Sequence, residues 1–240
     1  MKPMLFSTPM VQALLNTKPD AWPAEAIDAS KPCKSQTRRV IKPIPEYDFL
    51  YPVPIDGEWF WTECDTDDDM MGWWPSYDKG LSARYQVGDI LYVRETFGEK
   101  FVRDIEGEYI STGYVYKAGY NHDLIFDLNG RKWRPSIHMP REAARLFLEV
   151  KSVRVERLQD ITEADAKAEG AEYFDLFKLK QIPTTILMPG GAFGKGYMPK
   201  ASYKAGFYKI WQELNEKRGY SWDSNPWVWV YEFARVEVVK

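Results

Sequence analysis

Six consecutive residues, Lys34 to Arg39, combine an amine, a hydroxyl and two guanidinium groups. Lys34 stands three residues before Thr37, so a potential base and a potential nucleophile share one short segment. Arg38 and Arg39 follow directly, and adjacent guanidinium groups can hold a phosphate through bidentate hydrogen bonds. The same residue types are also typical of a solvated basic turn.

Composition limits the classes of protein to consider. A chain of 240 residues can bury a substantial core, and contents of 45% hydrophobic and 28% charged residues are those of an ordinary globular protein. The net charge of -3 argues against a general nucleic-acid coat protein and favours a small or single nucleotide target over a long duplex. Aromatic residues make up 15% of the chain, which suits both a core and stacking on bases.

Several functions are disfavoured by what the sequence lacks. Its two cysteines and two histidines make a disulfide framework or a zinc site improbable, so we expect no metal and no cofactor. The Gly-rich basic stretch 189–206 does not have the sequence pattern of a phosphate-binding P-loop. Two interpretations stay open for it, a mobile lid that contacts phosphate and a plain flexible connection. No signal peptide pattern and no run of about 20 apolar residues is present, which predicts a cytoplasmic protein with no membrane partner.

Two helices and a bent strand are predicted around the candidate residues. Thr8 followed by Pro9 favours a helix start with Thr8 as N-cap. In residues 145–158 the apolar alternation changes phase at Lys151-Ser152, which indicates a β-bulge. A short helix opens after Thr162 and ends at Gly170, so that Glu169 lies in its last turn, where an anion is electrostatically disfavoured.

The remaining pattern predicts an α+β fold. Strands are expected at 90–93, 109–117 and 227–233, and a helix is expected over 203–214. We expect one domain over 1–240, a small, partly open β-barrel flanked by helices, with long loop insertions at about 43–86, 98–135 and 171–201. No βαβ alternation with a Gly-rich turn supports a dinucleotide-binding fold.

Three separated segments resemble the ASCH family of the PUA-like superfamily. They are Lys34-Ser35-Gln36-Thr37-Arg38-Arg39, Val87-Gly88-Asp89-Ile90-Leu91, and Leu158-Gln159-Asp160-Ile161-Thr162-Glu163 with Ala166 and Glu169. Over nearly the whole chain, a closer likeness is to ASCH-like proteins of bacteriophages and prophages. It is carried by residues 2–10, 88–96, 133–140 and 225–230.

The resemblance implies a PUA-like β-barrel and a link to RNA, nucleosides or modified bases. Small members of the family are amidohydrolases that deacetylate N(4)-acetylcytidine with the lysine and threonine of a Lys-x-x-Thr motif and a later glutamate. By resemblance the catalytic residues are Lys34, Thr37 and Glu169. The chain departs from the pattern in its greater length and in having Cys33 directly before the lysine, where most relatives have Gly-Arg.

The chemistry of amide hydrolysis assigns roles to these residues. Thr37 would attack the acyl carbon after losing its proton to neutral Lys34, or it would only position a water. Glu169 would shuttle a proton to the leaving amine or orient Lys34. The expected substrate-binding residues are Arg38, Arg39, Arg94 and Glu95, although an arginine could instead pair with surface carboxylates, and Arg94 could pair with Glu95.

Two functions therefore remain open. An amidohydrolase of a modified nucleoside or nucleotide requires Lys34, Thr37 and Glu169 to converge within hydrogen-bonding reach. A non-catalytic PUA-like binder of RNA or modified bases requires a basic cleft, and its affinity would depend on salt.

Overall fold

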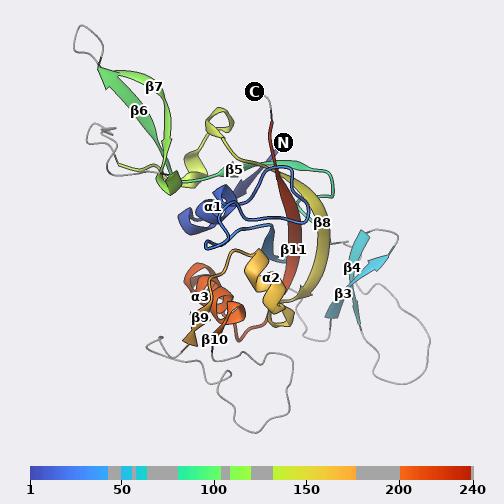
Figure 1. Cartoon of the computed structure of the whole chain (residues 1–240). Helices are drawn as coiled ribbons and strands as arrows, with labels where there is room; N and C mark the ends of the chain where they lie inside the picture. Colours follow the sequence, from blue (N-terminus) through green and yellow to red (C-terminus); the bar gives the residue numbers. More distant parts are fainter. Residues whose placement is uncertain are drawn as a thin grey trace.

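The computed structural model describes residues 1–42, 50–55, 58–63, 81–103, 109–119, 132–176 and 201–238. These residues form the predicted α+β fold, with one mixed five-stranded sheet, smaller two-stranded sheets and a few helices (Figure 1). Along the chain the strands and α-helices are β1 (Lys2–Leu5), α1 (Thr8–Leu15), β2 (Gln36–Val40), β3 (Leu50–Ile55), β4 (Glu58–Glu63), β5 (Ile90–Arg94), β6 (Phe97–Arg103), β7 (Tyr109–Tyr116), β8 (Phe147–Arg157), α2 (Glu163–Ala168), β9 (Phe174–Asp175), β10 (Ala201–Ser202), α3 (Tyr203–Asn215) and β11 (Trp227–Val236).

Short 3-10 helices connect several of these elements. They are η1 (Lys117–Gly119), η2 (Ser136–His138), η3 (Arg141–Ala143), η4 (Leu158–Asp160) and η7 (Glu216–Arg218). The strands predicted at 90–93, 109–117 and 227–233 and the helix predicted over 203–214 are confirmed.

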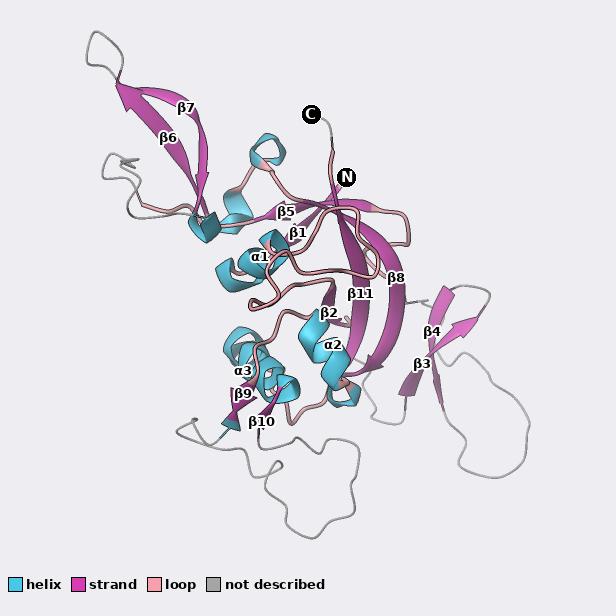
Figure 2. Ribbon diagram, in the orientation of Figure 1, coloured by secondary structure: helices cyan, strands magenta, loops and turns pink. Residues whose placement is uncertain are grey.

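The main sheet has the order β1-β5-β8-β11-β2. β1 runs parallel to β5, and the other neighbours are antiparallel. The long strands β8 and β11 lie side by side and curve together (Figure 2). β11 is nearly continuously buried along Val228 to Ala234, as expected of a strand covered on both faces.

The two edge strands of this sheet, β1 and β2, approach each other without pairing. The guanidinium of Arg39 in β2 donates to the carbonyl oxygen of Leu5 in β1 at 2.8 Å. Directly after β1, the ring of Phe6 packs edge-on against Phe233 of β11, with 6.1 Å between centroids. Within the described residues no closed barrel is present. In place of the predicted partly open barrel there is a curled sheet, and its two edge strands are connected by the side chain of Arg39.

The predicted bulge is confirmed. Ser152 pairs with Glu232, but the next pair along the strands joins Val150 to Phe233, so Lys151 is the extra residue of β8. Because side chains alternate along a strand, one extra residue returns Val150 to the face that Val153 occupies. Both valines contribute to the same apolar core, which explains why the alternation changes phase in the sequence.

Two apolar clusters cover the opposite faces of β11. One unites α1 with the sheet and includes Trp229, Tyr231 and Phe233. The other unites α2 and α3 with Val228 and Val230. Complete burial of each large apolar side chain stabilises the fold by about 1.5–3 kcal/mol, so these clusters fix the positions of α1 and α2 against β2 and β11.

The helix ends agree with the sequence at α2 and differ at α1. Thr162 caps α2 in a capping box with Asp165, as predicted for the N-cap. The N-cap of α1 is Ser7 instead of Thr8, and it makes no side-chain capping bond, so that part of the prediction was wrong. Pro9 has no N–H to donate, and this residue lies in the first turn, where the N–H groups have no partner within the helix.

The predicted insertions contain two described hairpins, β3–β4 and β6–β7, which project from the main sheet in Figure 1. Most of the Gly-rich stretch 189–206 falls outside the described residues; its described part forms β10 and the start of α3. No helix of the described chain is long and apolar enough to cross a membrane.

Buried tyrosines predict a loss of stability at high pH. Burial raises the pKa of Tyr231 from 10.0 to about 12. Between pH 10 and 12 the unfolded chain therefore releases a proton that the folded chain retains, and stability falls as pH rises. The Tyr231 contribution to this loss is roughly 2 kcal/mol at pH 12.

Thermal unfolding from pH 8 to 12, followed by circular dichroism, measures this slope. Tyr231→Phe should flatten it, whereas Tyr173→Phe, which removes an exposed hydroxyl, should leave it unchanged. An identical alkaline slope in the wild type and in Tyr231→Phe would contradict the assignment.

Candidate functional site

Two residues at the end of α1 place Lys34. The Asn16 side chain donates to the carbonyl oxygens of Asp28, Lys31 and Pro32 at 2.9, 3.0 and 3.1 Å, and so folds the connection back on the helix. The buried Thr17 hydroxyl accepts from the Lys34 N–H at 3.0 Å and lies 3.2 Å from the Lys34 carbonyl oxygen. Lys34 is therefore held on both sides of its Cα before β2 begins.

Glu169 is placed by the end of α2. The Ser35 N–H donates to the carbonyl oxygen of Ala168 at 2.9 Å, which docks the end of this helix beside the start of β2. Gly170 then leaves the helix at φ +82°, a left-handed conformation that glycine adopts freely. A Cβ on Gly170 would lie 3.0 Å from the Cβ of Ala13 and 3.4 Å from that of Lys34, so glycine also permits this close approach.

Lys34 and Glu169 form a buried ion pair. The Lys34 ammonium donates to the Glu169 carboxylate Oε2 at 2.9 Å and to the Glu169 backbone oxygen at 2.7 Å. The two side chains are only 1% and 5% exposed. The structure thus brings together two predicted site residues that lie 135 positions apart in the chain.

Arg38 binds the other oxygen of the same carboxylate. Its Nη1 donates to Glu169 Oε1 at 3.2 Å, and its Nε donates to Glu156 Oε1 at 2.9 Å. Its Nη2 also contacts Glu156 and lies 3.6 Å from Asp165 Oδ2. Arg38 thus pairs with carboxylates, but these are buried or partly buried and not the surface carboxylates of the alternative interpretation.

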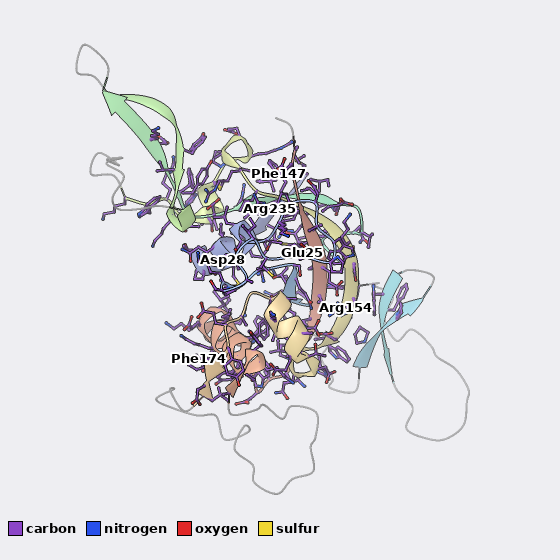
Figure 3. All side chains as sticks on the ribbon, viewed as in Figure 1. Glu25, Asp28, Phe147, Arg154, Phe174 and Arg235 are labelled. Carbon is purple, nitrogen blue, oxygen red and sulfur yellow. The ribbon has the colours of Figure 1, made fainter. Side chains whose placement is uncertain are left out.

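Arg154 extends these contacts into a charged cluster beside α2 (Figure 3). It contacts Asp165 at 3.0 Å, Glu156 at 3.3 Å and Glu232. The charged cluster comprises three cations and four carboxylates, namely Lys34, Arg38, Arg154, Glu156, Asp165, Glu169 and Glu232. Lys34, Arg38 and Glu169 are the buried members, and pairing within the cluster offsets the cost of burying their charges.

The side chains of Thr37 and Arg39 project from the face of β2 opposite to that of Arg38. In the register with β11, Thr37 stands opposite Tyr231. The hydroxyl of Thr37 makes no hydrogen bond to any residue that the structure describes, and Thr37 is 4% exposed. Arg39 lies over the Phe6 ring at 5.4 Å, and the Lys34 ammonium lies 5.6 Å from the centroid of the same ring. The predicted convergence is therefore direct for Lys34 with Glu169 and not for Thr37.

Burial shifts the pKa of Lys34 below its ordinary value of 10.5, and the Glu169 carboxylate partly opposes this by favouring the ammonium. The charges of Arg39 and Arg38 lower it further. Partial burial alone would raise the pKa of Asp165, but its hydrogen bonds from Thr162 and the charge of Arg38 lower it below 3.8. The cluster thus holds a lysine that loses its proton more readily than a lysine in water.

Arg94 and Glu95 lie in a different environment. Glu95 is 1% exposed and accepts two hydrogen bonds from Arg145, at 2.8 and 2.9 Å. Arg94 donates to the carbonyl oxygen of Ile137 at 3.2 Å. Glu95 pairs with Arg145 instead of Arg94, and within the described chain neither residue bonds to Lys34, Thr37 or Glu169. Their predicted role in substrate binding stays a prediction.

Sequence reasoning missed the residues that support the pair. Asn16 and Thr17 directly follow the end of α1, where a polar side chain commonly binds backbone groups, and this signal could have identified them. Arg154 and Glu156 had a weaker signal, because both are charged residues that alternate with the partly buried Val153 and Val155 along β8.

Comparisons with known proteins returned nothing: no family model, curated protein or solved structure matches the chain.

A glycine substitution tests the close approach of α2 to Lys34. Gly170→Ala should destabilise the protein more than Gly219→Ala, because both residues have a positive φ but only Gly170 has side chains within 4 Å of the added Cβ. The difference should be on the order of 1–3 kcal/mol, the usual cost of overpacking. Urea unfolding of the two variants measures it, and equal losses would refute the close contact.

Removing one charge of the buried pair should be costly. Lys34→Met leaves Glu169 with Arg38 as its remaining cation, so we expect a loss of about 3 kcal/mol, the lower end for a broken buried pair. The double variant Lys34→Met/Glu169→Gln should lose less than the sum of the two single variants. Additive losses in a double-mutant cycle would mean that the two groups do not interact.

Proposed function

We propose that this protein is a PUA-like, ASCH-type amidohydrolase that deacylates N(4)-acetylcytidine or a similar modified nucleoside or nucleotide. The observation that carries the proposal is the 2.9 Å contact between Lys34 and the Glu169 carboxylate. Two groups with the right chemistry, far apart in sequence, meet in a buried position, and burial lowers the pKa of the amine. An amine whose pKa is lowered by burial and that is held by a carboxylate is the combination expected of an active-site base.

The fold supports the same proposal. A curled five-stranded sheet whose edge strands β1 and β2 meet through Arg39 and Leu5 is consistent with an open form of the PUA-like barrel. The Lys34–Glu169 pair lies at the start of β2, next to this junction of the two edges. In this proposal a nucleobase enters between the two edge strands.

In the proposed reaction, neutral Lys34 accepts the proton of the Thr37 hydroxyl as Oγ1 attacks the acyl carbon. The tetrahedral oxyanion then collapses, the C–N bond breaks, and Glu169 relays the proton from Lys34 to the leaving nitrogen. Water next hydrolyses the acyl-threonine and releases the carboxylic acid. In the second route Thr37 only positions a water, which attacks directly while Lys34 takes its proton.

Access to the pair would require a covering side chain to move. Phe6 lies against both Lys34 and Arg39 and is itself 6% exposed. A rotation of this ring would expose the Lys34 ammonium and the Arg39 guanidinium on the face of β2 from which the Thr37 side chain projects. Thr37 would then come within reach of a bound acyl group without any change in the sheet.

Deacylation of N(4)-acetylcytidine by the purified protein tests the proposal directly. Conversion to cytidine is followed by chromatography. Glu169→Gln and Lys34→Met should each lower kcat/KM by about 100-fold or more, the usual contribution of general acid–base groups. Thr37→Ala should do the same on the acyl-threonine route and have a smaller effect on the water route. A wild-type protein that releases no product from any N-acylated cytidine, as nucleoside or nucleotide, would refute the proposal.

The pH dependence separates Lys34 from other bases. Because a neutral amine is needed, kcat/KM should rise as pH rises through the Lys34 pKa, below 10.5. Glu169 favours the ammonium, so Glu169→Gln should move the rising limb of the remaining activity to lower pH. If the rising limb of the pH profile keeps its position in Glu169→Gln, the group that titrates there is not Lys34.

A second candidate, a non-catalytic binder of RNA or modified bases, is favoured by one observation. The Thr37 hydroxyl has no hydrogen bond to Lys34 or Glu169 in the described structure. A binder would retain its affinity for RNA in Thr37→Ala, lose affinity in Arg39→Ala and bind more weakly as salt increases. Retention of RNA on a filter at several salt concentrations distinguishes it from the enzyme.

A further inference from the structure

Gln36, the first residue of β2, carries a buried hydrogen-bond donor that the fold does not use. The residue is 3% exposed, and its side-chain Nε2 has no hydrogen-bond partner among the described residues. Buried polar groups are nearly always paired, because an unpaired one loses its hydration without compensation. Such a group points to an additional binding partner.

The position of Gln36 places this donor beside the proposed site. It stands between Lys34 and Thr37 in the chain. Residues two apart on a strand share a face, so Gln36 leaves β2 on the same side as Arg38, which binds Glu169. β2 is an edge strand, so a ligand at its free edge can meet side chains from both faces.

The cationic donors near Gln36 are already engaged. Lys34 donates to the backbone oxygen and carboxylate of Glu169, and Arg38 donates to Glu156 and Glu169. A neutral ligand group that needs a donor would have to break a buried ion pair to use either of them. Gln36 offers an N–H without that cost.

We propose that Gln36 recognises the nucleobase, its Nε2 donating to a carbonyl oxygen or ring nitrogen of the base. An uncharged carboxamide suits such acceptors, as it does on base edges in general, whereas phosphate groups favour guanidinium. The inference rests on the proposed function and names the part of the ligand that the site reads. Gln36 thereby determines specificity, while Lys34 and Glu169 supply the acid–base chemistry.

The test replaces Gln36 with methionine, which has similar length and no donor. The Tm of Gln36→Met should equal or exceed that of the wild type, because an unpaired buried amide is removed. The KM for N(4)-acetylcytidine should rise about 10-fold or more, with a smaller change in kcat. Gln212→Met is the matched control: Gln212 accepts from the Trp222 N–H at 2.6 Å, so its loss should lower the Tm.

Two results would overturn the inference alone. If Gln36→Met lowers the Tm as much as Gln212→Met, the carboxamide is turned the other way and its oxygen accepts a bond within the fold. If Gln36→Met keeps both the Tm and the KM, the donor meets no ligand. Failure of the proposed function gives a different result: the wild type then neither deacylates the nucleoside nor gains Tm in its presence, and the inference falls with it. A wild type that gains Tm without deacylation, while Gln36→Met gains less, supports recognition by a binder.

Discussion

The sharing of one buried carboxylate between two cations is the interaction on which the rest of this structure depends. Glu169 Oε2 accepts from Lys34 and Oε1 accepts from Arg38, and neither cation is accessible to water. A charge moved from water into a protein interior is stable only when it is paired and hydrogen-bonded. The end of α2, the start of β2 and the segment after α1 must therefore keep their relative positions.

The supporting elements can be understood from this requirement. Thr17 and Asn16 fix the backbone on the Lys34 side. On the Glu169 side, the capping box of Thr162 sets where α2 begins, and Gly170 lets it end against Lys34. Further from the pair, Arg154 connects β8 and β11 to α2 through their carboxylates. Local backbone hydrogen bonds and long-range ion pairs thus hold the same small region of the structure in place.

Features that depend on residues close together in the chain could be predicted from the sequence. Features that depend on contacts between distant segments could not. The bulge at Lys151 could be predicted because apolar residues alternate along a strand with one buried face, and an extra residue shifts the phase of that alternation. The cap of α2 at Thr162 was visible because it depends on neighbouring residues alone. Lys34 and Glu169 were expected to meet through resemblance to a family, not through periodicity. Nothing local specifies that Glu95 should pair with Arg145, since the two meet only after β5 and β8 are placed.

The barrel was predicted from a bend, and a bend is not sufficient to close a sheet. Curvature comes from twist and from the extra residue in β8, but closure also needs backbone pairing between the edge strands. Here a single guanidinium of Arg39 spans the edges instead.

The contact between the Ser35 N–H and the Ala168 carbonyl has a consequence for solubility. β2 is an edge strand, and unpaired backbone groups at such an edge can recruit strands from other molecules. By docking beside the start of β2, the end of α2 covers part of that edge with a helix. The charged cluster that holds α2 in place thereby also guards against edge-to-edge association. A substitution that freed α2 would therefore expose this strand edge as well as break the buried charge pairs.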